Sequence, residues 1–577
     1  MSVKPKIMDH PAFKTRAEFL DTDERVALAY SRAKALLEAW NLSLDDISHC
    51  SPKFWAMQND PAVVLDIGCN NVLACHINLF IGTLAPHAVK RPEIATLLQK
   101  ALRFEVVGNL LLSEIGHGLD ILNLETTATW NGDGFVLHTP NPRAAKFMPP
   151  TTPISTVSKY AIVMAHLVIG GRSYGIHPFL VRTSEGSKMA KGVSSKRLPP
   201  RSGSSPLDFA LTIFDNVSLP KSAFLGDPKF LSGCPTVPTA EQIQKRLHAY
   251  IWRIGIGSMA IAVPTVNAMK MVAYIGGTYS QLRHVRGKGS VELPIIAFRT
   301  QQLPVLYAVA LSRVFDAWLP KAIETFMDQR LPTQVRHAMA VVFKATTCRL
   351  LTWSCREVGE RLGAQGTFGH NLVSQMEMDC RGISIAEGDI LVLCIRLWSE
   401  LLLERYHLVP YPDSATLLAR RSADYFKSGR TLLHSFEKGH RDPRFNALVL
   451  PVSERAICAY GHALAHGYAR RAGVAQPLLD LFELAVIKLD PTWYIECAGI
   501  TGESLMDSED RAVQATLPAL DKYIRELDVS SYVTAPIVDA SRWSDWENQL
   551  REHRTEDGGG QDVYHIKGAN SFVLSKL

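Results

Sequence analysis

Glu387 is a side chain whose type and neighbours could support acid–base chemistry. It stands in the turn Ala386-Glu387-Gly388-Asp389, just before an apolar helical pattern. The small neighbours Ala386 and Gly388 would allow a flat group to approach the carboxylate closely. Burial against such a group raises the pKa of a carboxyl and helps it to act as a base near neutral pH. Taken alone, the motif is more simply explained as an exposed glutamate at a helix start.

A second reactive side chain, His117, lies between two glycines in Gly116-His117-Gly118. A histidine can serve as an acid or a base near neutral pH, but we expect His117 to shape the backbone instead. The ten cysteines show neither CxxC nor Cys/His spacing, so no metal site is predicted. Their scatter is typical of reduced, mostly buried thiols in an intracellular protein.

The elements that must position these residues are mostly helical. In the first hundred or so residues, helical patterns cover residues 21–40, 62–86 and 92–114. Helical patterns return from about residue 240 and continue to about 550, starting with a long apolar-rich pattern over 243–275. No internal repeat and no low-complexity run interrupts them.

The segment 113–235 has a different pattern, with short strand-like runs between Gly, Pro, Asp and Asn turns. The sequence Asn-Gly-Asp-Gly at 131–134 is a strong hairpin signal, and the glycine pair at 170–171 joins two apolar runs. A β segment between helical segments predicts domains packed around a shared cleft, where cofactor sites tend to lie.

Composition sets broad limits on function. A chain of 577 residues is long enough for two to four domains. Its composition is that of an ordinary globular protein, with 47% hydrophobic and 20% charged residues. The net charge of +6 is small and its basic residues are spread out, so no nucleic-acid partner is expected. A small net positive charge suits an anionic substrate, but many proteins carry such a charge.

Two further signals concern location. The N-terminal residues lack the apolar run of a secretory signal, and no stretch reaches the ~18 uninterrupted apolar residues expected of a membrane span. The last three residues, Ser575-Lys576-Leu577, match a peroxisomal address that an import receptor reads as a free C-terminus. We therefore expect no membrane span and a location in the peroxisomal matrix.

Several blocks resemble the acyl-CoA oxidases. That family carries a Thr/Ser-Glu-Leu-Gly-His-Gly stretch followed by Leu-Glu-Thr-Thr-Ala, and this chain has SEIGHG at 113–118 and LETTAT at 124–129. Similar blocks follow in the family's order at 277–302, 356–371 and 383–402. The resemblance covers most of residues 10–410, whereas 411–550 match only as a helical domain of about the right length.

The resemblance implies a mainly α fold with a central β-barrel domain. It implies an N-terminal α domain (1–112), the β-barrel (113–235), a first C-terminal helical bundle (240–410), a second helical domain (411–555) and a tail (556–577). It also implies a homodimer, with FAD held between the barrel and the first bundle.

The activity implied is the α,β-desaturation of an acyl-CoA thioester to trans-2-enoyl-CoA, the first step of fatty-acid β-oxidation. Glu387 matches the family's catalytic base, which removes the α-proton while the β-hydrogen leaves as hydride to the flavin. The reduced flavin then passes its electrons to O₂ and gives H₂O₂. Gly116 and Gly388 are the expected substrate contacts.

The resemblance also assigns flavin-ring contacts. Ser113 stands where the family has a Thr or Ser that contacts the flavin. The family's Gly-Gly pair is missing, because this chain has Pro149-Pro150-Thr151-Thr152. Proline has no N–H to donate, so Thr151 or Thr152 must supply any contact there.

The rest of the cofactor site is expected further along the chain. Arg283 stands where related dehydrogenases place an arginine that reaches the FAD diphosphate across the dimer, and its neighbour Arg286 could do so instead. Gln301 and Gln302 match a Gln-Gln pair, with Gln302 the expected contact. Residues 363–366 match a Gly-rich cofactor loop, in which Gly363 and Gly366 are the expected contacts and Ala364 replaces one usual glycine.

Three alternatives stay open. The chain could be a dehydrogenase that passes electrons to a carrier protein, since no residue settles oxygen access to the flavin. It could be a tailoring enzyme for an unusual acyl or polyketide thioester, because the ring segment is altered. It could also be a flavin-free protein that only binds CoA esters.

Overall fold

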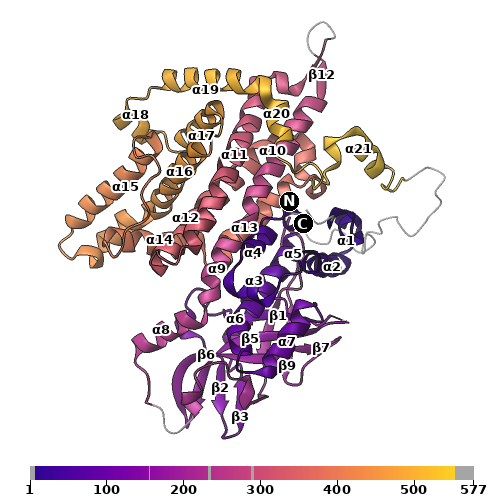
Figure 1. Cartoon of the computed structure of the whole chain (residues 1–577), viewed down its shortest axis with the longest axis vertical. Helices are drawn as coiled ribbons and strands as arrows, with labels where there is room; N and C mark the ends of the chain where they lie inside the picture. The colour runs from indigo at the N-terminus through magenta and orange to yellow at the C-terminus, as the bar shows by residue number, and fades with distance from the viewer. Residues whose placement is uncertain (1–6, 155, 232–235, 287–290, 553–577) are drawn as a thin grey trace, which may run out of the picture.

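The computed structural model describes residues 7–154, 156–231, 236–286 and 291–552. The predicted address Ser575-Lys576-Leu577 and the tail before it lie outside the described residues. Figure 1 shows a curled β domain at one end of the molecule, with the N-terminal helices against it, and long helices at the other end.

The N-terminal helices form the predicted α block. They are α1 (Pro11–Lys14), α2 (Thr22–Trp40), α3 (Leu44–His49), α4 (Pro52–Gln58), α5 (Ile67–Leu73), the π-helical segment η4 (Ala74–Ile81), α6 (Gly82–Ala88) and α7 (Pro92–Leu102). A capping box starts α2, since the Glu24 N–H donates to Asp21 Oδ1 at 2.8 Å and Asp21 N–H donates to Glu24 Oε2 at 2.9 Å. The α2 helix then packs its apolar face on α5.

The central domain consists of strands in two main sheets. One sheet has the order β1-β5-β2-β3-β11, with β6 paired to β5, and the other has the order β4-β10-β9. The strands are β1 (Val106–Leu111), β2 (Thr127–Trp130), β3 (Gly134–His138), β4 (Lys146–Met148), β5 (Ser158–Ile169), β6 (Arg172–Arg182), β9 (Val193–Arg197), β10 (Ala210–Phe214) and β11 (Val217–Pro220). The hairpin predicted at 131–134 is confirmed, because β2 pairs antiparallel with β3. The two apolar runs joined by the glycine pair at 170–171 form a second antiparallel pair, β5 with β6.

The predicted helix over 92–114 is wrong in its second half. Helix α7 ends at Leu102, and β1 follows at Val106–Leu111, parallel to β5. Every residue of β1 is buried, and a fully buried strand has no alternation that separates it from a buried helix. Gly108 has to be a glycine here, since a Cβ would lie 1.9 Å from the Phe80 ring.

The first C-terminal bundle consists of α8 (Ala240–Tyr250), α9 (Trp252–Ala260), α10 (Pro264–Leu282), α11 (Arg299–Met327), α12 (Thr333–Arg361), α13 (Val373–Ile385) and α14 (Ile390–Leu402). The long helical pattern over 243–275 is therefore three successive helices. The breaks fall at Ile251 and at residues 261–263, just before Pro264, which occupies the first turn of α10.

A second helical group follows, as expected for this region. It consists of α15 (Leu417–His434), α16 (Ser453–Arg471), α17 (Gln476–Leu489), α18 (Thr492–Ala498), α19 (Gly502–Thr516), α20 (Leu520–Arg525) and α21 (Ala540–Glu547). Helix α16 packs against α11 and α12, which joins the two helical groups side by side (Figure 1).

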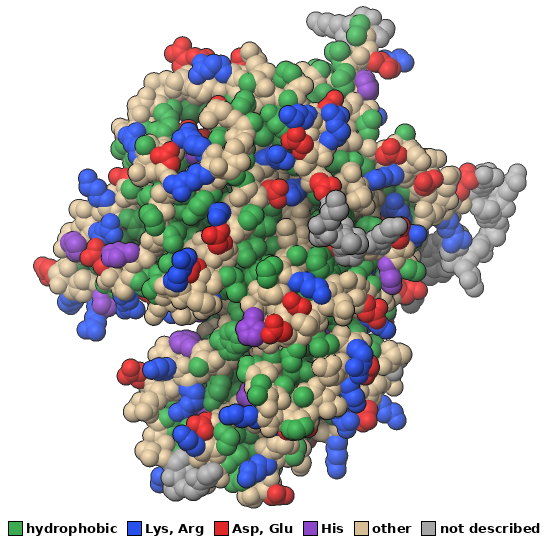
Figure 2. Space-filling view, in the orientation of Figure 1, with side chains coloured by type: hydrophobic (Ala, Val, Ile, Leu, Met, Phe, Trp, Pro, Cys, Tyr) green, Lys and Arg blue, Asp and Glu red, His purple; other side chains and the backbone are tan. Residues whose placement is uncertain are grey.

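Among the residues that the structure describes, three helical stretches are long and apolar enough to cross a membrane by length and composition: Ile67–Ala88, Trp252–Leu282 and Arg299–Met327. Within the fold, 89%, 94% and 72% of their most apolar windows are buried. Their apolar side chains therefore form the core. Figure 2 shows basic and acidic side chains interspersed over the outer face around them.

Candidate active site

Glu387 lies in the turn that connects α13 to α14, where the sequence predicted it. The backbone of Glu387 is left-handed, with φ of 54°, and Gly388 follows with φ of 96°. Such a conformation costs a non-glycine residue on the order of 1–3 kcal/mol, and this kind of strain gathers at functional sites. Asp389 caps the next helix by accepting a hydrogen bond from the Val392 N–H at 3.2 Å.

The Glu387 carboxyl lies against Gly257 of α9. A Cβ built on Gly257 would be 2.5 Å from Glu387 Cδ and 2.6 Å from Oε2. Any side chain at this position would therefore displace the carboxyl. The sequence analysis missed Gly257, although a glycine inside an apolar helix is a signal of close packing.

The surroundings of this carboxyl favour its neutral form. Burial raises the pKa of Glu387 to about 8, and the positive charges of Lys344 and Arg253 act in the opposite direction. The residue as a whole is half-buried, and the carboxyl is its enclosed end. A carboxyl whose pKa lies near the working pH can exchange a proton with a bound group, which is the property that a general base needs.

Two other elements contribute polar groups near Glu387. Arg253 of α9 is fully buried, and its guanidinium donates to Asn78 O and to Ile47 O, each at 3.0 Å. Cys75 of η4 is half-buried, and burial together with the charge of Glu387 raises the pKa of its thiol to about 12. The thiol therefore stays protonated at neutral pH beside the carboxyl.

The predicted flavin contact Ser113 lies just after β1. Its hydroxyl donates to Gly118 O at 3.4 Å, and its carbonyl accepts from the Phe147 N–H at 3.0 Å. Gly116 donates its N–H to Arg143 O at 2.9 Å, and a Cβ on Gly116 would lie 2.9 Å from Arg143 Cβ. The structure thus gives Gly116 a packing role within the loop.

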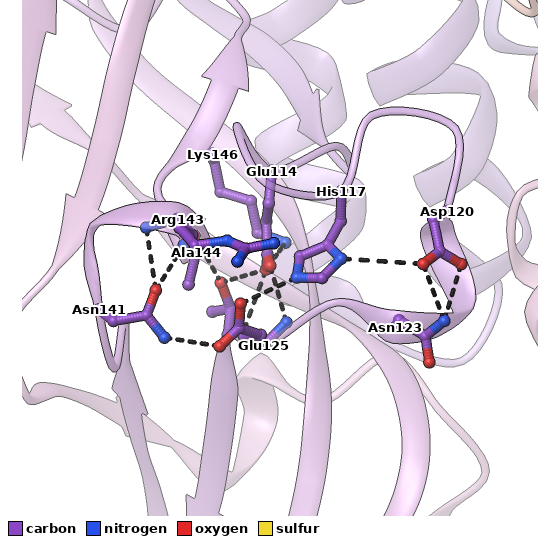
Figure 3. Close-up of polar contacts among 10 residues, drawn as sticks. Glu114, His117, Asp120, Asn123, Glu125, Asn141, Arg143, Ala144 and Lys146 are labelled. Carbon is purple, nitrogen blue, oxygen red and sulfur yellow. Dashed lines mark hydrogen bonds and ion pairs between the residues drawn. The ribbon is translucent and has the colours of Figure 1, made fainter.

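Polar contacts hold this loop, as Figure 3 shows. Glu114 and Lys146 form an ion pair at 3.0 Å whose side chains are both fully buried. His117 Nε2 lies 2.8 Å from Glu125 Oε1, so this histidine anchors the loop, in line with the backbone-shaping role we expected. The Glu125 carboxylate also accepts from Asn141 Nδ2 at 2.6 Å.

Thr151 and Thr152 direct their hydroxyls into the protein. Thr151 is fully buried, and its Oγ1 lies 2.7 Å from Thr212 Oγ1 and 2.8 Å from Ser195 Oγ. The Thr152 hydroxyl donates to Asp208 Oδ2 at 2.5 Å. Because both hydroxyls are bonded to other side chains, any contact of this segment with a flavin must come from its backbone.

A buried ion pair fixes the same segment from behind. Lys159 Nζ donates to Asp208 Oδ2 at 2.7 Å, to Pro150 O at 2.9 Å and to Tyr30 Oη at 2.6 Å. Because Tyr30 belongs to α2, this cluster ties the segment to the N-terminal helices. The altered Pro-Pro-Thr-Thr sequence is therefore built rigidly into the fold.

Arg283, Gln301 and Gly363 line one surface pocket of about 360 Å³, together with Tyr279 and Arg361 among others. Gly363 has φ of 61°, a conformation that favours glycine. A guanidinium beside a glycine turn suits a diphosphate. Two residues predicted to hold the cofactor, Arg283 and Gly363, are thus brought together, although they lie 80 residues apart in the sequence.

Two other predicted contacts do not face this pocket. The Gln302 side-chain amide N–H donates to Ile296 O at 3.0 Å, whereas its neighbour Gln301 lines the pocket. Gly366 packs on α12, where a Cβ would lie 2.0 Å from Gly359 O. On a helix, consecutive residues face different sides, so the motif alone could not decide between the two glutamines.

Known proteins resemble this chain in sequence over part of its length. No family model matches the chain. Acyl-coenzyme A oxidase acox-1.1 of Caenorhabditis elegans is 34% identical over 347 residues, 57% of this chain and 50% of that protein. Peroxisomal acyl-coenzyme A oxidase 1 of Arabidopsis thaliana is 30% identical over 247 residues, 41% of this chain and 36% of that protein. The matched regions therefore span half or less of these relatives.

Solved structures match over nearly the whole chain. Arabidopsis thaliana acyl-CoA oxidase 1 has a TM-score of 0.76 at 18% identity and covers 98% of this chain and 93% of its own. Acyl-CoA oxidase 1 of Yarrowia lipolytica has a TM-score of 0.77 at 17% identity, over 98% and 91%. The chain has the acyl-CoA dehydrogenase and oxidase fold, with a curled β domain between helical parts, as predicted. Together with the sequence matches, this confirms the resemblance to the acyl-CoA oxidase family.

Proposed function

We propose that the protein is an FAD-dependent acyl-CoA oxidase, which converts an acyl-CoA and O₂ into trans-2-enoyl-CoA and H₂O₂. The observation that carries the proposal is the enclosed Glu387 carboxyl, with its pKa raised to about 8, on a turn between packed helices. The chain's similarity to acyl-CoA oxidases supports the same reaction.

The reaction requires a base at one side of the acyl chain. The Glu387 carboxylate removes the α-proton of the thioester and holds it, while its position against Gly257 fixes the direction of approach. When bound, FAD would supply the acceptor for the β-hydrogen as hydride and the route for its electrons to O₂. The half-buried Cys75 and the buried Arg253 interact with the charge of this carboxyl.

The residues present fit FAD in part. Arg283 and the turn at Gly363 suit the diphosphate, because the Arg283 guanidinium and the exposed backbone at Gly363 line the same pocket. Ser113 remains our proposed contact to the flavin ring, with the backbone of Thr151 and Thr152 in place of their hydroxyls. Gly388, next to the base, remains the proposed substrate contact.

Assembly and location are part of the proposal. We infer a homodimer, supported by the position of the Arg283 pocket at the surface beside exposed apolar residues such as Leu282, Val285 and Phe298. We place the enzyme in the peroxisome, supported by the Arabidopsis relative, which is named as peroxisomal. We also propose that the enzyme lies in the peroxisomal matrix and is imported through Ser575-Lys576-Leu577.

The test is the visible spectrum of the purified protein. Oxidised flavin absorption should disappear when an acyl-CoA is added without oxygen, and air should restore it with release of one H₂O₂ per enoyl-CoA. Glu387→Gln should keep the colour and slow bleaching by ~10²–10⁴-fold, the usual worth of a general base. Glu377→Gln, on α13, should bleach normally. A colourless protein, or bleaching by Glu387→Gln at the parent rate, would overturn the proposal.

One observation favours a second candidate, the desaturation of an unusual acyl thioester. The Pro149-Pro150-Thr151-Thr152 segment is held by Lys159 and Asp208 with both hydroxyls turned inward, which changes the polar groups available near the ring. Bleaching rates with acyl-CoAs of graded length and branching decide between the candidates. A clear preference for straight chains would support ordinary β-oxidation.

A further inference from the structure

The turn that carries Glu387 is held by side chains from two other helices. Lys344 of α12 donates from Nζ to Ala386 O at 2.5 Å and to Gly388 O at 2.6 Å. The Ser258 hydroxyl of α9 donates to Glu387 O. Three successive carbonyl oxygens of the turn therefore accept hydrogen bonds from outside it.

Lys344 is an unusual residue to find in this place. Its side chain is fully buried in the apolar interior, and none of the ion pairs among the described residues includes it. Burying an ammonium group whose hydrogen bonds go to backbone carbonyls instead of a carboxylate is costly, so stability alone does not explain this lysine. The two carbonyls lie just after the end of α13, where a helix favours a positive charge.

Lys344 also acts on Glu387 through its charge. Its positive charge lowers the pKa of Glu387, against the larger effect of burial, and Arg253 adds to it from α9. The charge of Glu387 acts in turn on Cys75 of η4. Burial lowers the pKa of Lys344 itself, while the charges of Cys348, Glu387, Asp389 and Cys394 act to raise it.

We propose that Lys344 is the positioning residue of the catalytic turn: it locks the backbone on both sides of Glu387 and keeps a positive charge near the carboxylate that forms there. The proposal rests on the proposed function for its catalytic meaning. Its structural part, a turn locked by Lys344 and Ser258, stands independently.

The first test measures the lock directly, by hydrogen exchange of the purified holoenzyme in the peptide covering residues 386–392. Lys344→Met keeps the length of the side chain but removes both donated bonds, so exchange in this peptide should accelerate at least tenfold. Ser258→Ala removes one bond without a change of charge and should accelerate it less. Lys427→Met, at an exposed lysine of α15, is the matched control and should leave it unchanged.

The second test measures the charge, through the pH dependence of flavin bleaching by an acyl-CoA without oxygen. A base must be ionised, so bleaching falls on the acidic side of the Glu387 pKa. Removing the charge of Lys344 raises that pKa, so the acidic limb should move to higher pH by roughly one unit in Lys344→Met, a tenfold loss of rate on that limb. Ser258→Ala should lower the rate without moving the limb.

The outcomes separate this proposal from the proposed function. Parent-like exchange and an unmoved limb in Lys344→Met would overturn the role of Lys344. If Lys344→Met does not fold, unchanged exchange in Ser258→Ala overturns the lock. If Glu387→Gln bleaches normally, the proposed function fails, whereas the exchange result for Lys344→Met still tests the lock.

Discussion

At the scale of single residues, the candidate site depends on the close approach of one carboxyl to one glycine. Glu387 is aimed at α9 by a left-handed turn, and Gly257 is the point where its carboxyl meets the helix. A glycine in a helix costs roughly 1 kcal/mol relative to alanine, so its presence here indicates that the space is needed.

Gly257→Ala should therefore impair catalysis while the fold survives. The added Cβ would lie 2.5 Å from Glu387 Cδ, so the carboxyl must move away from its present position. A misplacement of this size lowers catalytic rates on the order of 10²-fold. Stopped-flow bleaching measures the loss. Gly359→Ala on α12 is the control, because its Cβ meets only ordinary contact at 3.6 Å. Equal rates in both variants would contradict the packing argument.

Glu387→Gln should make the protein more stable, and increasingly so as the pH rises. The pKa of Glu387 is about 8 in the folded state against 4.5 in a free side chain. The folded state thus binds more protons between these values, so the parent loses stability from about pH 4.5 up to pH 8. Glutamine has no such loss, so the gain should reach on the order of 1–3 kcal/mol above pH 8. Denaturant unfolding at pH 5 and pH 8.5 checks the sign, and a gain independent of pH would contradict it.

At the scale of elements, the loop after β1 is positioned by the buried pair Glu114–Lys146. Burial works to raise the pKa of Glu114, but Lys146 and the hydrogen bonds from Thr126 and the Glu125 N–H lower it overall. Lys146 also donates to Leu112 O at 3.0 Å and to Met164 O at 2.7 Å. One lysine thus joins β1, the loop and β5.

Lys146→Met should destabilise the β domain by about 3–5 kcal/mol, because it leaves the charge of Glu114 buried without a partner. The double variant Lys146→Met with Glu114→Gln removes that charge and should recover part of the loss. Denaturant unfolding of the three proteins provides the comparison. A double variant less stable than Lys146→Met alone would show that the ion pair is not the source of the loss.

Local signals predicted the elements better than the site. The turn at 131–134 has the residues that hairpin turns prefer, and its hairpin was predicted from them. The glycine pair at 170–171 marked the join between two apolar runs, which the structure pairs as β5 and β6. Strand β1 was missed because a buried strand and a buried helix share one apolar pattern. Lys344 was missed because its partner Ala386 lies 42 residues away, and Ser258 lies 129 residues from Glu387. No local pattern reports contacts of this range.

At the scale of the whole molecule, the site of the base and the Arg283 pocket are separate places. Glu360, at the pocket, lies sixteen residues after Lys344 on α12, a rise of about 24 Å. The resemblance predicted that Arg283 serves the cofactor of the second subunit. Arg286, the other arginine considered, lies on the exposed strand β12 (His284–Arg286), 4.0 Å from Glu292.

Mixed dimers test this arrangement. Co-expression of Arg283→Ala and Glu387→Gln subunits with different tags, followed by purification on both tags, yields heterodimers only. If Arg283 acts across the dimer, one of the two sites combines a normal base with a normal arginine, so about half of the parent activity should return. If Arg283 acts within its own subunit, neither site is intact and the heterodimer is inactive.

A matched control heterodimer should give the opposite result for each of the two arrangements. A heterodimer of the parent with the double variant Arg283→Ala and Glu387→Gln has no intact site if the arginine acts across the dimer, and one intact site if it does not. Arg286→Ala paired with Glu387→Gln should be half as active in either case, because Arg286 lies outside the pocket wall. Activity from the parent and double-variant dimer would contradict the shared site, because only an arginine that serves the base of its own subunit leaves that dimer an intact centre.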